Sequence, residues 1–415
     1  MLNLGGAVIP MEQDLDKNVF QKIQFLVGSE KNLMQSGKLR ALPMFSKEMT
    51  DFLADLSRML LSDERAKDYV DVISYAYWIR NSSLLKERDK YHDRDSRLGR
   101  GIAFHIAPSN VPVNFAVSMT SSLLAGNGCI VRVSDKPFMQ VSLICEAINR
   151  LLSEKYKALE PYFCILRYPH DESITQYLSS ICDIRIIWGG DQTILKIRKA
   201  ILPPRAIELT FADRYSLALV DADAYLKEDP EKVAEKFYMD TYYTDQNACS
   251  SPRIVIWFGN EKARARECFF RTLEKKVERE YCMQPITAVD KYASFCSLAM
   301  KTGGIRLLKG EGNRLMRVEV QKLTEELMEN KPGGGYFFEY EASKLTDILP
   351  LLAKGCQTVS LLGIDAGTVK EMIIKYGVRG VDRIVAMGKT MDLEFVWDGF
   401  RMIEAMTRII YVGEK

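Results

Sequence analysis

Short apolar runs alternate with segments of helical spacing from Gly101 onward. The runs predict buried strands: IAFHIA (102–107), CIVRVS (129–134), FCILRY (163–168), IRIIWG (184–189) and the stretches near 206–210 and 215–220. Strands that alternate with helices imply βαβ crossovers, which join parallel strands. The pattern therefore predicts an α/β fold built on a parallel sheet.

A second series of alternating runs begins after Cys249. Its predicted strands are PRIVIWF (252–258), the run that follows PGGGY at 332–336, TVSLL (358–362) and RIVAM (383–387). Its predicted helices cover 260–280, 288–300 and 320–329. The glycines of PGGGY lack the Lys-Ser/Thr of a phosphate loop, so they indicate a turn before a strand.

The two series predict two α/β domains. We expect the first domain to cover residues 1–244, with a helical lead-in before Gly101, and the second to cover 245–390. The tail, 391–415, either returns to the first domain or forms an oligomerisation element. Because parallel sheets bind ligands at the carboxyl ends of their strands, those ends are where a site is expected.

Composition and charge exclude several classes of protein. The formal net charge of +2 over 415 residues gives no electrostatic case for a nucleic-acid partner. The N-terminal segment MLNLGGAVIPMEQDLD lacks a basic region followed by an apolar core, so no signal peptide is expected. We find no run of 18 or more apolar residues, so no membrane span is expected either.

The cysteines favour a reducing compartment. Nine cysteines, an odd number without a close C-x-x-C pair, argue against a disulfide framework and against a zinc site. We therefore expect no metal and a cytoplasmic location. The thiols are then free, and one of them is a candidate nucleophile.

Cys249 is the thiol with the most unusual surroundings. In TDQNACSSPR (244–253) it lies among side chains that can donate hydrogen bonds to a thiolate, whereas Cys129 lies in the apolar run GCIVRV. Its position at the expected domain junction also favours a cleft. The alternative is a small residue in a loop between domains.

A cysteine–histidine hydrolase is the competing interpretation of Cys249. His92, His105 and His170 all precede Cys249, whereas the papain-like order places the histidine after the cysteine. His105 lies inside a predicted buried strand, where a core histidine is the simpler interpretation. The sequence thus gives little support to a hydrolase.

Polar and small residues gather at the carboxyl ends of the predicted strands. The candidates are Pro108, Ser109 and Asn110 after the first strand, Arg132, Ser134 and Asp135 after the second, and Trp188, Gly189 and Gly190 after the fourth. Asn110 can donate to a developing oxyanion or cap the following helix. Arg132 suits the phosphate of NADP and Asp135 the ribose hydroxyl of NAD, so the cofactor stays open here.

Together these stretches resemble the aldehyde dehydrogenase superfamily and, within it, the LuxC-type acyl-CoA reductases. The segments that carry the resemblance are GRGIAFHIAPSNVPVNF (99–115), LLAGNGCIVRVSDKP (123–137), IRIIWGGDQ (184–192), DQNACSSPR (245–253) and RIVAMGKTMDLEFVWDG (383–399). The resemblance implies a nucleotide-binding domain, a catalytic domain and frequent homo-oligomers. It aligns Cys249 with the catalytic cysteine.

The resemblance also implies a reaction. Cys249 would accept the acyl group of a fatty acyl-CoA or of an acyl donor enzyme, and CoA would leave. Asn110 and a backbone N–H would hold the oxyanion. NADPH (with NADH as the alternative), bound by the strand-end residues from Pro108 to Gly190, would then reduce the acyl group to a long-chain aldehyde.

One departure from the superfamily pattern favours reduction. Oxidising members activate water with the glutamate of E-L-G-G-K, but this chain reads ELTFADRYS from Glu208, and Leu209 lies nearer that position. Glu339 is only a weak substitute for a second cofactor-side glutamate. The alternatives are an aldehyde dehydrogenase that forms acid and an acyl-carrier module without redox activity.

Overall fold

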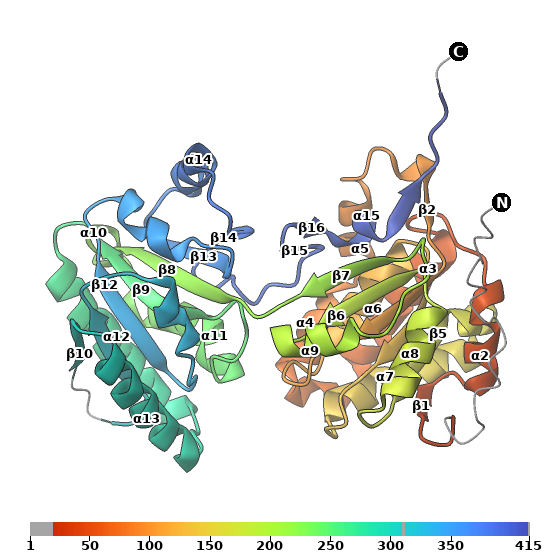
Figure 1. The fold of residues 1–415 in the computed structure, drawn as a ribbon, viewed down its shortest axis with the longest axis horizontal. Helices are drawn as coiled ribbons and strands as arrows, with labels where there is room; N and C mark the ends of the chain where they lie inside the picture. The colour runs from red at the N-terminus through yellow and green to blue at the C-terminus, as the bar shows by residue number, and fades with distance from the viewer. Residues whose placement is uncertain (1–19, 309–311, 414–415) are drawn as a thin grey trace, which may run out of the picture. The chain divides into compact units, whose positions relative to one another are not determined.

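The computed structural model of the protein describes residues 20–308 and 312–413, so the N-terminal segment examined for a signal peptide lies outside the described residues. Contacts divide the chain into two compact units (Figure 1). Unit 1 contains the described residues up to Ala212 and those from Met402 onward, and unit 2 contains Asp213–Arg401. Each unit is built on its own sheet with helices, as the alternating pattern predicts.

The sheet of unit 1 has the strand order β1-β5-β4-β3-β6-β7. All neighbours pair in parallel except β1, which is antiparallel to β5. The strands are β1 (Gln24–Val27), β3 (Ile102–Ile106), β4 (Gly128–Arg132), β5 (Phe163–Arg167), β6 (Ile184–Trp188) and β7 (Ile207–Phe211). The chain builds outward from β3 in both directions, so β3 and β6 flank a topological switch point.

Helices cover both faces of this sheet, which explains why its strands are apolar along their length. Phe104 packs on one face with Leu33, Ile174 and Ile194 from three helices, whereas His105 points to the other face and contacts Ser118 of α6. The helices are α2 (Glu30–Gln35), α3 (Lys47–Ser62), α4 (Val70–Trp78), α5 (Asn81–Arg88), α6 (Asn114–Leu124), α7 (Met139–Glu154), α8 (Glu172–Ser180) and α9 (Asp191–Ile197). Short 3-10 helices are η1 (Ser36–Lys38), η2 (Glu64–Asp68), η3 (Arg94–Ser96) and η4 (Lys157–Tyr162).

Both chain ends add strands to unit 1. The expected helical lead-in holds for α2 to α5, but it missed β1, whose hydrogen bonds to β5 extend the sheet. The tail contributes α15 (Met402–Ala405) and β17 (Thr407–Ile409), and β17 pairs antiparallel with β2 (Arg97–Gly99). Both strands form by pairing with segments distant in sequence, so the local residue pattern did not predict them.

The sheet of unit 2 has the order β10-β11-β12-β9-β8-β13-β14. Its strands are β8 (Tyr215–Asp221), β9 (Pro252–Phe258), β10 (Ile305–Leu308), β11 (Met316–Val320), β12 (Tyr336–Glu341), β13 (Cys356–Leu362) and β14 (Arg383–Ala386). Only β10 among them is antiparallel to its neighbour. A separate hairpin joins β15 (Val396–Trp397) to β16 (Phe400–Arg401).

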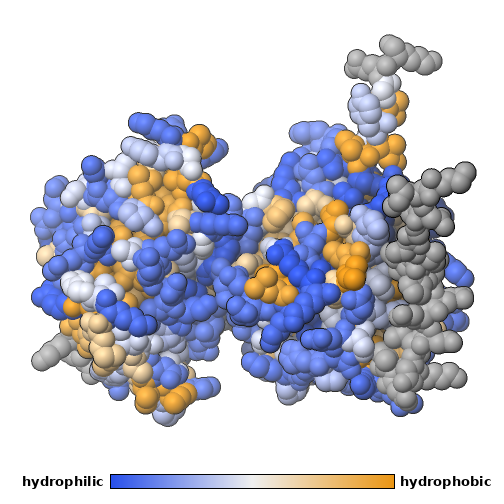
Figure 2. Space-filling model, in the orientation of Figure 1, coloured by the Kyte–Doolittle hydropathy of each residue, from blue (hydrophilic) through white to orange (hydrophobic). Residues whose placement is uncertain are grey.

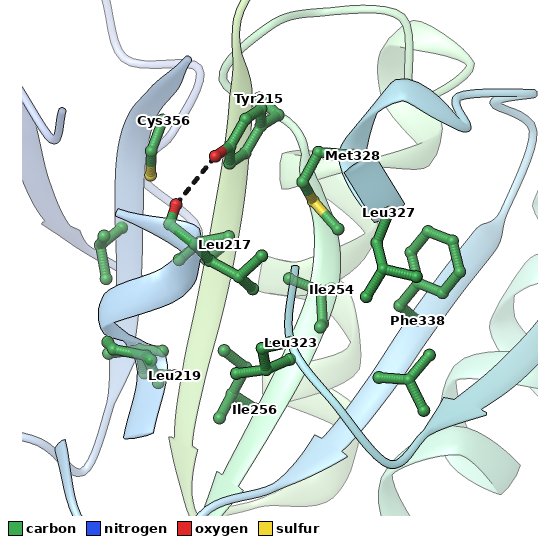
Figure 3. Packing of buried hydrophobic residues seen from close by; sticks show 14 of the residues in the cluster. Tyr215, Leu217, Leu219, Ile254, Ile256, Leu323, Leu327, Met328, Phe338 and Cys356 are labelled. Atoms are coloured by element: carbon green, nitrogen blue, oxygen red, sulfur yellow. Dashed lines mark hydrogen bonds between the residues drawn. The ribbon is translucent and has the colours of Figure 1, made fainter. Parts of the chain in front are cut away.

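Alternating residues of the unit 2 strands build two cores. Leu217 and Ile254 pack on the face drawn in Figure 3, where Tyr215 donates its hydroxyl to the Leu351 carbonyl (2.9 Å). Ala218 and Val255 pack on the opposite face. The covering elements are α10 (Ala222–Tyr225), α11 (Pro230–Asp240), α12 (Lys262–Glu280), α13 (Pro285–Lys301), α14 (Ala366–Tyr376), η5 (Tyr242–Thr244), η6 (Glu325–Glu329) and η7 (Leu345–Leu351).

Two predicted features differ from the structure. The expected boundary at 244/245 is displaced to 212/213, because β8 pairs with β9 and β13 and therefore belongs to the second sheet. The helix expected over 320–329 is instead the end of β11 followed by η6. Met316, Val318 and Val320 of β11 alternate as buried strand residues, and of these only Val320 lies within the expected helix. Beyond it, Leu327 and Met328 are buried in the unit 2 core from the short 3-10 helix η6.

The face drawn in Figure 2 is largely hydrophilic, with local apolar patches. Exposed apolar side chains include Ile286, Val289 and Met300 of α13. None of the helices within the described ranges combines the length and the apolar character that a membrane crossing requires.

Candidate active site

Cys249 lies in a tightly held loop between η5 and β9. Two non-glycine residues before it, Asp245 (φ 52°) and Gln246 (φ 59°), adopt the left-handed conformation. Strain of this kind persists only where neighbouring contacts enforce it. Here Asp245 accepts a hydrogen bond from the Tyr281 hydroxyl (2.8 Å), and its carbonyl accepts one from the Gly334 N–H (2.8 Å).

The buried amide of Gln246 holds this loop against the glycine turn. Its Oε1 accepts the N–H groups of Gly335 and Tyr336, and its Nε2 donates to the carbonyls of Pro252 and Tyr336, all at 3.0 Å. A β-carbon at Gly335 (φ 83°) would collide with the Tyr242 hydroxyl and the Arg314 carbonyl. PGGGY is therefore the turn that the sequence indicates, and its tight path supports the Cys249 loop.

Replacing Gln246 by alanine is expected to destabilise unit 2. The Gln246→Ala variant leaves two backbone N–H groups and two carbonyls without their partner, at a cost of about 2–4 kcal/mol. The unfolding temperature should fall by about 5–10 °C in differential scanning calorimetry. Gln321→Ala, which removes an exposed glutamine of the same unit, is the control. Equal unfolding temperatures for the two variants would contradict this stabilising role of the Gln246 hydrogen bonds.

Cys249 is a half-buried residue, and its sulfur has a hydrogen-bond donor from a distant strand. Gln357, at the start of β13, donates from Nε2 to the sulfur (3.2 Å) and to Oδ1 of Asp398 (2.6 Å). Three of the polar neighbours expected to donate to the sulfur form other hydrogen bonds: Gln246 with the backbone, Ser250 with the sulfur of Met391 and Ser251 with Thr244. For these three the expectation was wrong, because their side chains fix the loop, whereas Gln357 of β13 donates to the sulfur.

Charges around Cys249 act in opposite directions. Burial and, next, the carboxylate of Asp398 raise the pKa of the thiol, whereas the Gln357 amide and the Arg253 guanidinium lower it. The resting group is therefore mainly a thiol at neutral pH. Within residues 20–308 and 312–413, no cluster of three or more histidine, cysteine, aspartate or glutamate side chains has the arrangement of a metal site.

The other predicted site residues lie together in unit 1. Three neighbouring strands, β4, β3 and β6, end side by side, and their last residues and the loops that follow them hold all of these residues. Arg132 ends β4 and Trp188 ends β6, whereas the loops contain Pro108, Ser109, Asn110, Ser134, Asp135, Gly189 and Gly190. The loops after β3 and β6 border the switch point, where open α/β sheets bind ligands.

Aromatic and basic groups line this strand-end edge. Trp188 stacks on Phe211 with ring centroids 3.8 Å apart and donates its indole N–H to Ser118 (3.0 Å). Arg132 lies over the ring of Tyr168 (4.7 Å) and donates to its carbonyl (3.2 Å), while its buried Nε has no protein partner. A flat ring surface, two glycines and a partly unpaired guanidinium fit a dinucleotide.

Asn110 lies exposed in the loop after β3, whereas His105 is buried within β3. Asn110 is exposed and does not cap α6, since the N-cap position of that helix is Val113. His105 is fully buried and bonded through Nδ1 to Ser118 (2.8 Å), and burial lowers its pKa to about 3. A neutral buried imidazole of this kind matches the core histidine expected from the strand pattern.

Both glutamates considered for superfamily roles are engaged in ion pairs. Glu208 binds Arg185 (2.5 Å) and Arg198 (2.7 Å). Glu339 is fully buried between Arg266 (2.9 Å) and Arg317 (2.6 Å). Glu339 is therefore excluded as the weak substitute for a cofactor-side glutamate, because its carboxylate is shielded and already paired.

The sequence reasoning missed Gln357 and Asp398. Gln357 follows the core residue Cys356 and precedes the rest of a strand otherwise interpreted as core. Asp398 lies in WDG, a segment that contributes to the family resemblance but to which no role was given. The one available signal was the Asp-Gly pair, which marks a hairpin turn.

Residues 28–409 match the family model described as acyl-CoA reductase (LuxC). The chain belongs to the LuxC family. Relatives include the long-chain acyl-protein thioester reductases of Aliivibrio fischeri (26% identity, covering 83% of this chain and 69% of the relative) and Vibrio harveyi (25% identity, 70% and 59%). The chain thus spans about three fifths to two thirds of the lengths of these two proteins.

Solved structures place this LuxC-family chain in the aldehyde dehydrogenase fold. Aldehyde dehydrogenase 21 from Physcomitrella patens matches with a TM-score of 0.67 at 12% identity, covering 91% of this chain and 87% of that one. Lactaldehyde dehydrogenase from Escherichia coli matches with a TM-score of 0.63 at 14% identity, covering 92% and 89%. The predicted fold and the family resemblance are both confirmed.

Proposed function

We propose that the protein reduces a long-chain fatty acyl thioester to the aldehyde through an acyl group carried on Cys249, with NADPH as the reductant. The observation that carries the proposal is the hydrogen bond from the Gln357 amide to the sulfur of the half-buried residue Cys249, in a chain of the LuxC family. A thiol with a hydrogen-bond donor, on a loop held by buried hydrogen bonds, suits covalent acyl transfer.

The protein's own residues would perform the acyl transfer. The Cys249 thiolate attacks the thioester carbonyl, the bond from that carbon to the donor sulfur breaks, and the donor leaves as a thiolate. Asn110 and the Cys249 loop backbone donate to the oxyanion. Hydride addition to the acyl carbon then expels Cys249 and gives the aldehyde, and the regenerated thiolate takes its proton from solvent.

The strand-end residues of unit 1 would hold the nicotinamide cofactor. When bound, the reduced nicotinamide supplies the hydride. Trp188, Gly189 and Gly190 border the switch point and offer a flat, open surface to a planar ring. Arg132 offers a cation, already oriented by Tyr168, to the 2′-phosphate of NADPH.

Loss of the Arg132 cation should shift the choice of cofactor. Arg132→Met removes a charge-assisted contact to the extra phosphate, so the KM for NADPH should rise about 10- to 100-fold while the KM for NADH stays within about threefold. Steady-state kinetics with both cofactors measure this difference. Arg150→Met, on the exposed side of α7, is the matched control. An equal change for both cofactors would remove Arg132 from phosphate recognition.

The identity of the acyl donor divides the proposal into two forms. The first form uses acyl-CoA, in line with the description of the family. The second uses an acyl group on a protein, which is what the names of the relatives state for those proteins. We favour acyl-CoA because CoA suffices for every step assigned to Cys249. Oxidation of aldehyde to acid is disfavoured, since Glu208 is ion-paired and Leu209 is apolar.

A spectrophotometric screen tests the function. Acyl-CoAs of increasing chain length are combined with NADPH or NADH, cofactor oxidation is followed, and the aldehyde is trapped as a hydrazone. Expected are trapped long-chain aldehyde and equimolar NADPH oxidation. Activity only with an acylated protein would establish the second form. A radiolabelled acyl-enzyme that NADPH does not discharge would establish an acyl carrier and reject the reductase.

A further inference from the structure

The segment Trp397-Asp398-Gly399-Phe400 forms a two-residue hairpin turn. Asp398 (φ 46°) and Gly399 (φ 77°) both take the left-handed conformation between the paired strands β15 and β16. This is the turn in which Asp-Gly and Asn-Gly are favoured. Turn side chains usually lie in solvent, but the side chain of Asp398 is only 5% exposed, so the turn alone does not explain it.

Gln357 connects this turn to Cys249. Its neighbour Cys356 is buried in the core that Figure 3 shows, and the side chain of Gln357, 1% exposed, points to Cys249 and Asp398. One amide nitrogen donates both hydrogens, one to the Cys249 sulfur and one to the Asp398 carboxylate. The hydroxyl of Thr358 donates to the amide oxygen (3.3 Å).

When it is ionised, the Asp398 carboxylate determines which end of the Gln357 amide faces the sulfur. Burial and Asp382 raise the pKa of Asp398, whereas Arg214, the Gln357 amide and Arg383 lower it. A carboxylate only accepts hydrogen bonds, so Asp398 at 2.6 Å requires the nitrogen of Gln357 and not its oxygen. The same nitrogen then points its second hydrogen at Cys249. With the amide reversed, an oxygen would face both groups and repel a thiolate.

We propose that Gln357 and Asp398 are positioning residues for Cys249: Asp398 fixes the orientation of the Gln357 amide, and the Gln357 amide donates to the sulfur and stabilises the thiolate when the thiol ionises. The inference rests on the proposed function, because it takes Cys249 as the nucleophile. Asp398 acts on the sulfur through Gln357 and through its own charge. The Gln357 amide lowers the pKa of Cys249, whereas the negative charge of Asp398 raises it.

Other charged side chains act either on Asp398 or on Cys249. Arg214 lies 3.7 Å from Asp398 and also binds Asp382. Arg253 and Arg383 interact electrostatically with Cys249. Arg383 is held by three carbonyls, those of Lys389, Thr390 and Asp392, so it keeps its place when a neighbour is changed. These arginines also interact with carboxylates, Arg214 with Asp382, Arg253 with Asp213 and Arg383 with Asp392. The variants below change only the Gln357 amide and the Asp398 charge.

Site-resolved alkylation of the full-length protein tests the inference. The rate of iodoacetamide labelling of Cys249 is measured across pH from the tryptic peptide 237–253, which contains no other cysteine. Gln357→Met should raise the pKa of Cys249 by about one unit, since the donor is lost. Asp398→Asn keeps the turn and an acceptor oxygen but removes the negative charge, so the pKa should fall by about one unit.

A second variant and a control keep the result interpretable. Gln357→Glu has the same shape but places an acceptor at the sulfur. It should therefore raise the pKa of Cys249 by more than Gln357→Met does. Asp290→Asn, an exposed charge on α13, should leave the pKa of Cys249 unchanged. Unchanged or same-direction shifts for the Gln357 and Asp398 variants would overturn the inference. Opposite shifts in a protein without reductase activity would support it and reject only the proposed function.

Discussion

Cys249→Ala should abolish both acyl-enzyme formation and thioester-dependent oxidation of NADPH. Turnover is expected to fall by about 10⁴-fold or more, because the covalent step has no other nucleophile in the proposed chemistry. The fold should persist, because alanine fits the loop. The Gln246 hydrogen bonds that hold this loop do not involve the sulfur. Rapid-quench trapping with radiolabelled acyl-CoA measures acylation, and absorbance at the nicotinamide band measures reduction.

Cys296→Ala is the matched control for this result. Cys296 is exposed on α13 of the same unit, so its loss should leave acylation and turnover unchanged. Acyl label retained in Cys249→Ala would mean that another thiol accepts the acyl group. Full NADPH oxidation by that variant would remove Cys249 from the mechanism altogether.

Asn110→Ala should lower kcat by about 10²–10³ if the amide stabilises the oxyanion. The structure removes the competing role of Asn110 as a helix cap, because α6 begins at Asn114 with Val113 at the N-cap. The loss should appear in acylation and in reduction, since both pass through a tetrahedral oxyanion. Binding of NADPH should change little, and this separates a catalytic effect from a disturbed loop.

Asn81→Ala provides the reference for the asparagine variant, because Asn81 is exposed at the start of α5 in the same unit. Single-turnover acylation, steady-state kcat and an NADPH titration are compared in the two variants. An unchanged kcat for Asn110→Ala would contradict the oxyanion role. A loss that appears only as weaker NADPH binding would assign Asn110 to the cofactor instead.

Local patterns predicted most of the sheet strands well. The runs near 102–107, 129–134, 163–168 and 184–189 became β3, β4, β5 and β6 within about two residues at each end. Both faces of these strands are covered, so each is apolar along its whole length and stands out in the sequence. The same reasoning failed for β1, β2 and β17, which are short strands whose partners lie far along the chain.

The domain boundary also depends on strand pairing between segments distant in sequence. Strand β8 follows β7 directly in sequence, and its apolar run gives no sign of which sheet it joins. Only its hydrogen bonds to β9 and β13 place it in unit 2. The helix expected over 320–329 was wrong for a related reason, since Leu327 and Met328 pack into the unit 2 core from the short 3-10 helix η6.

For the site, the sequence by itself identified Cys249 as the unusual thiol and grouped the unit 1 candidates at strand ends, because parallel strands in one sheet end at one edge. It also predicted the α/β class and the family resemblance. Only the tertiary structure supplied Gln357 and Asp398, which lie 108 residues and more beyond Cys249. The strand order of the sheet brings Gln357 to the sulfur, and a separate hairpin brings Asp398 to Gln357. Hydrogen bonds between distant segments depend on that order, and no local pattern of residues encodes it.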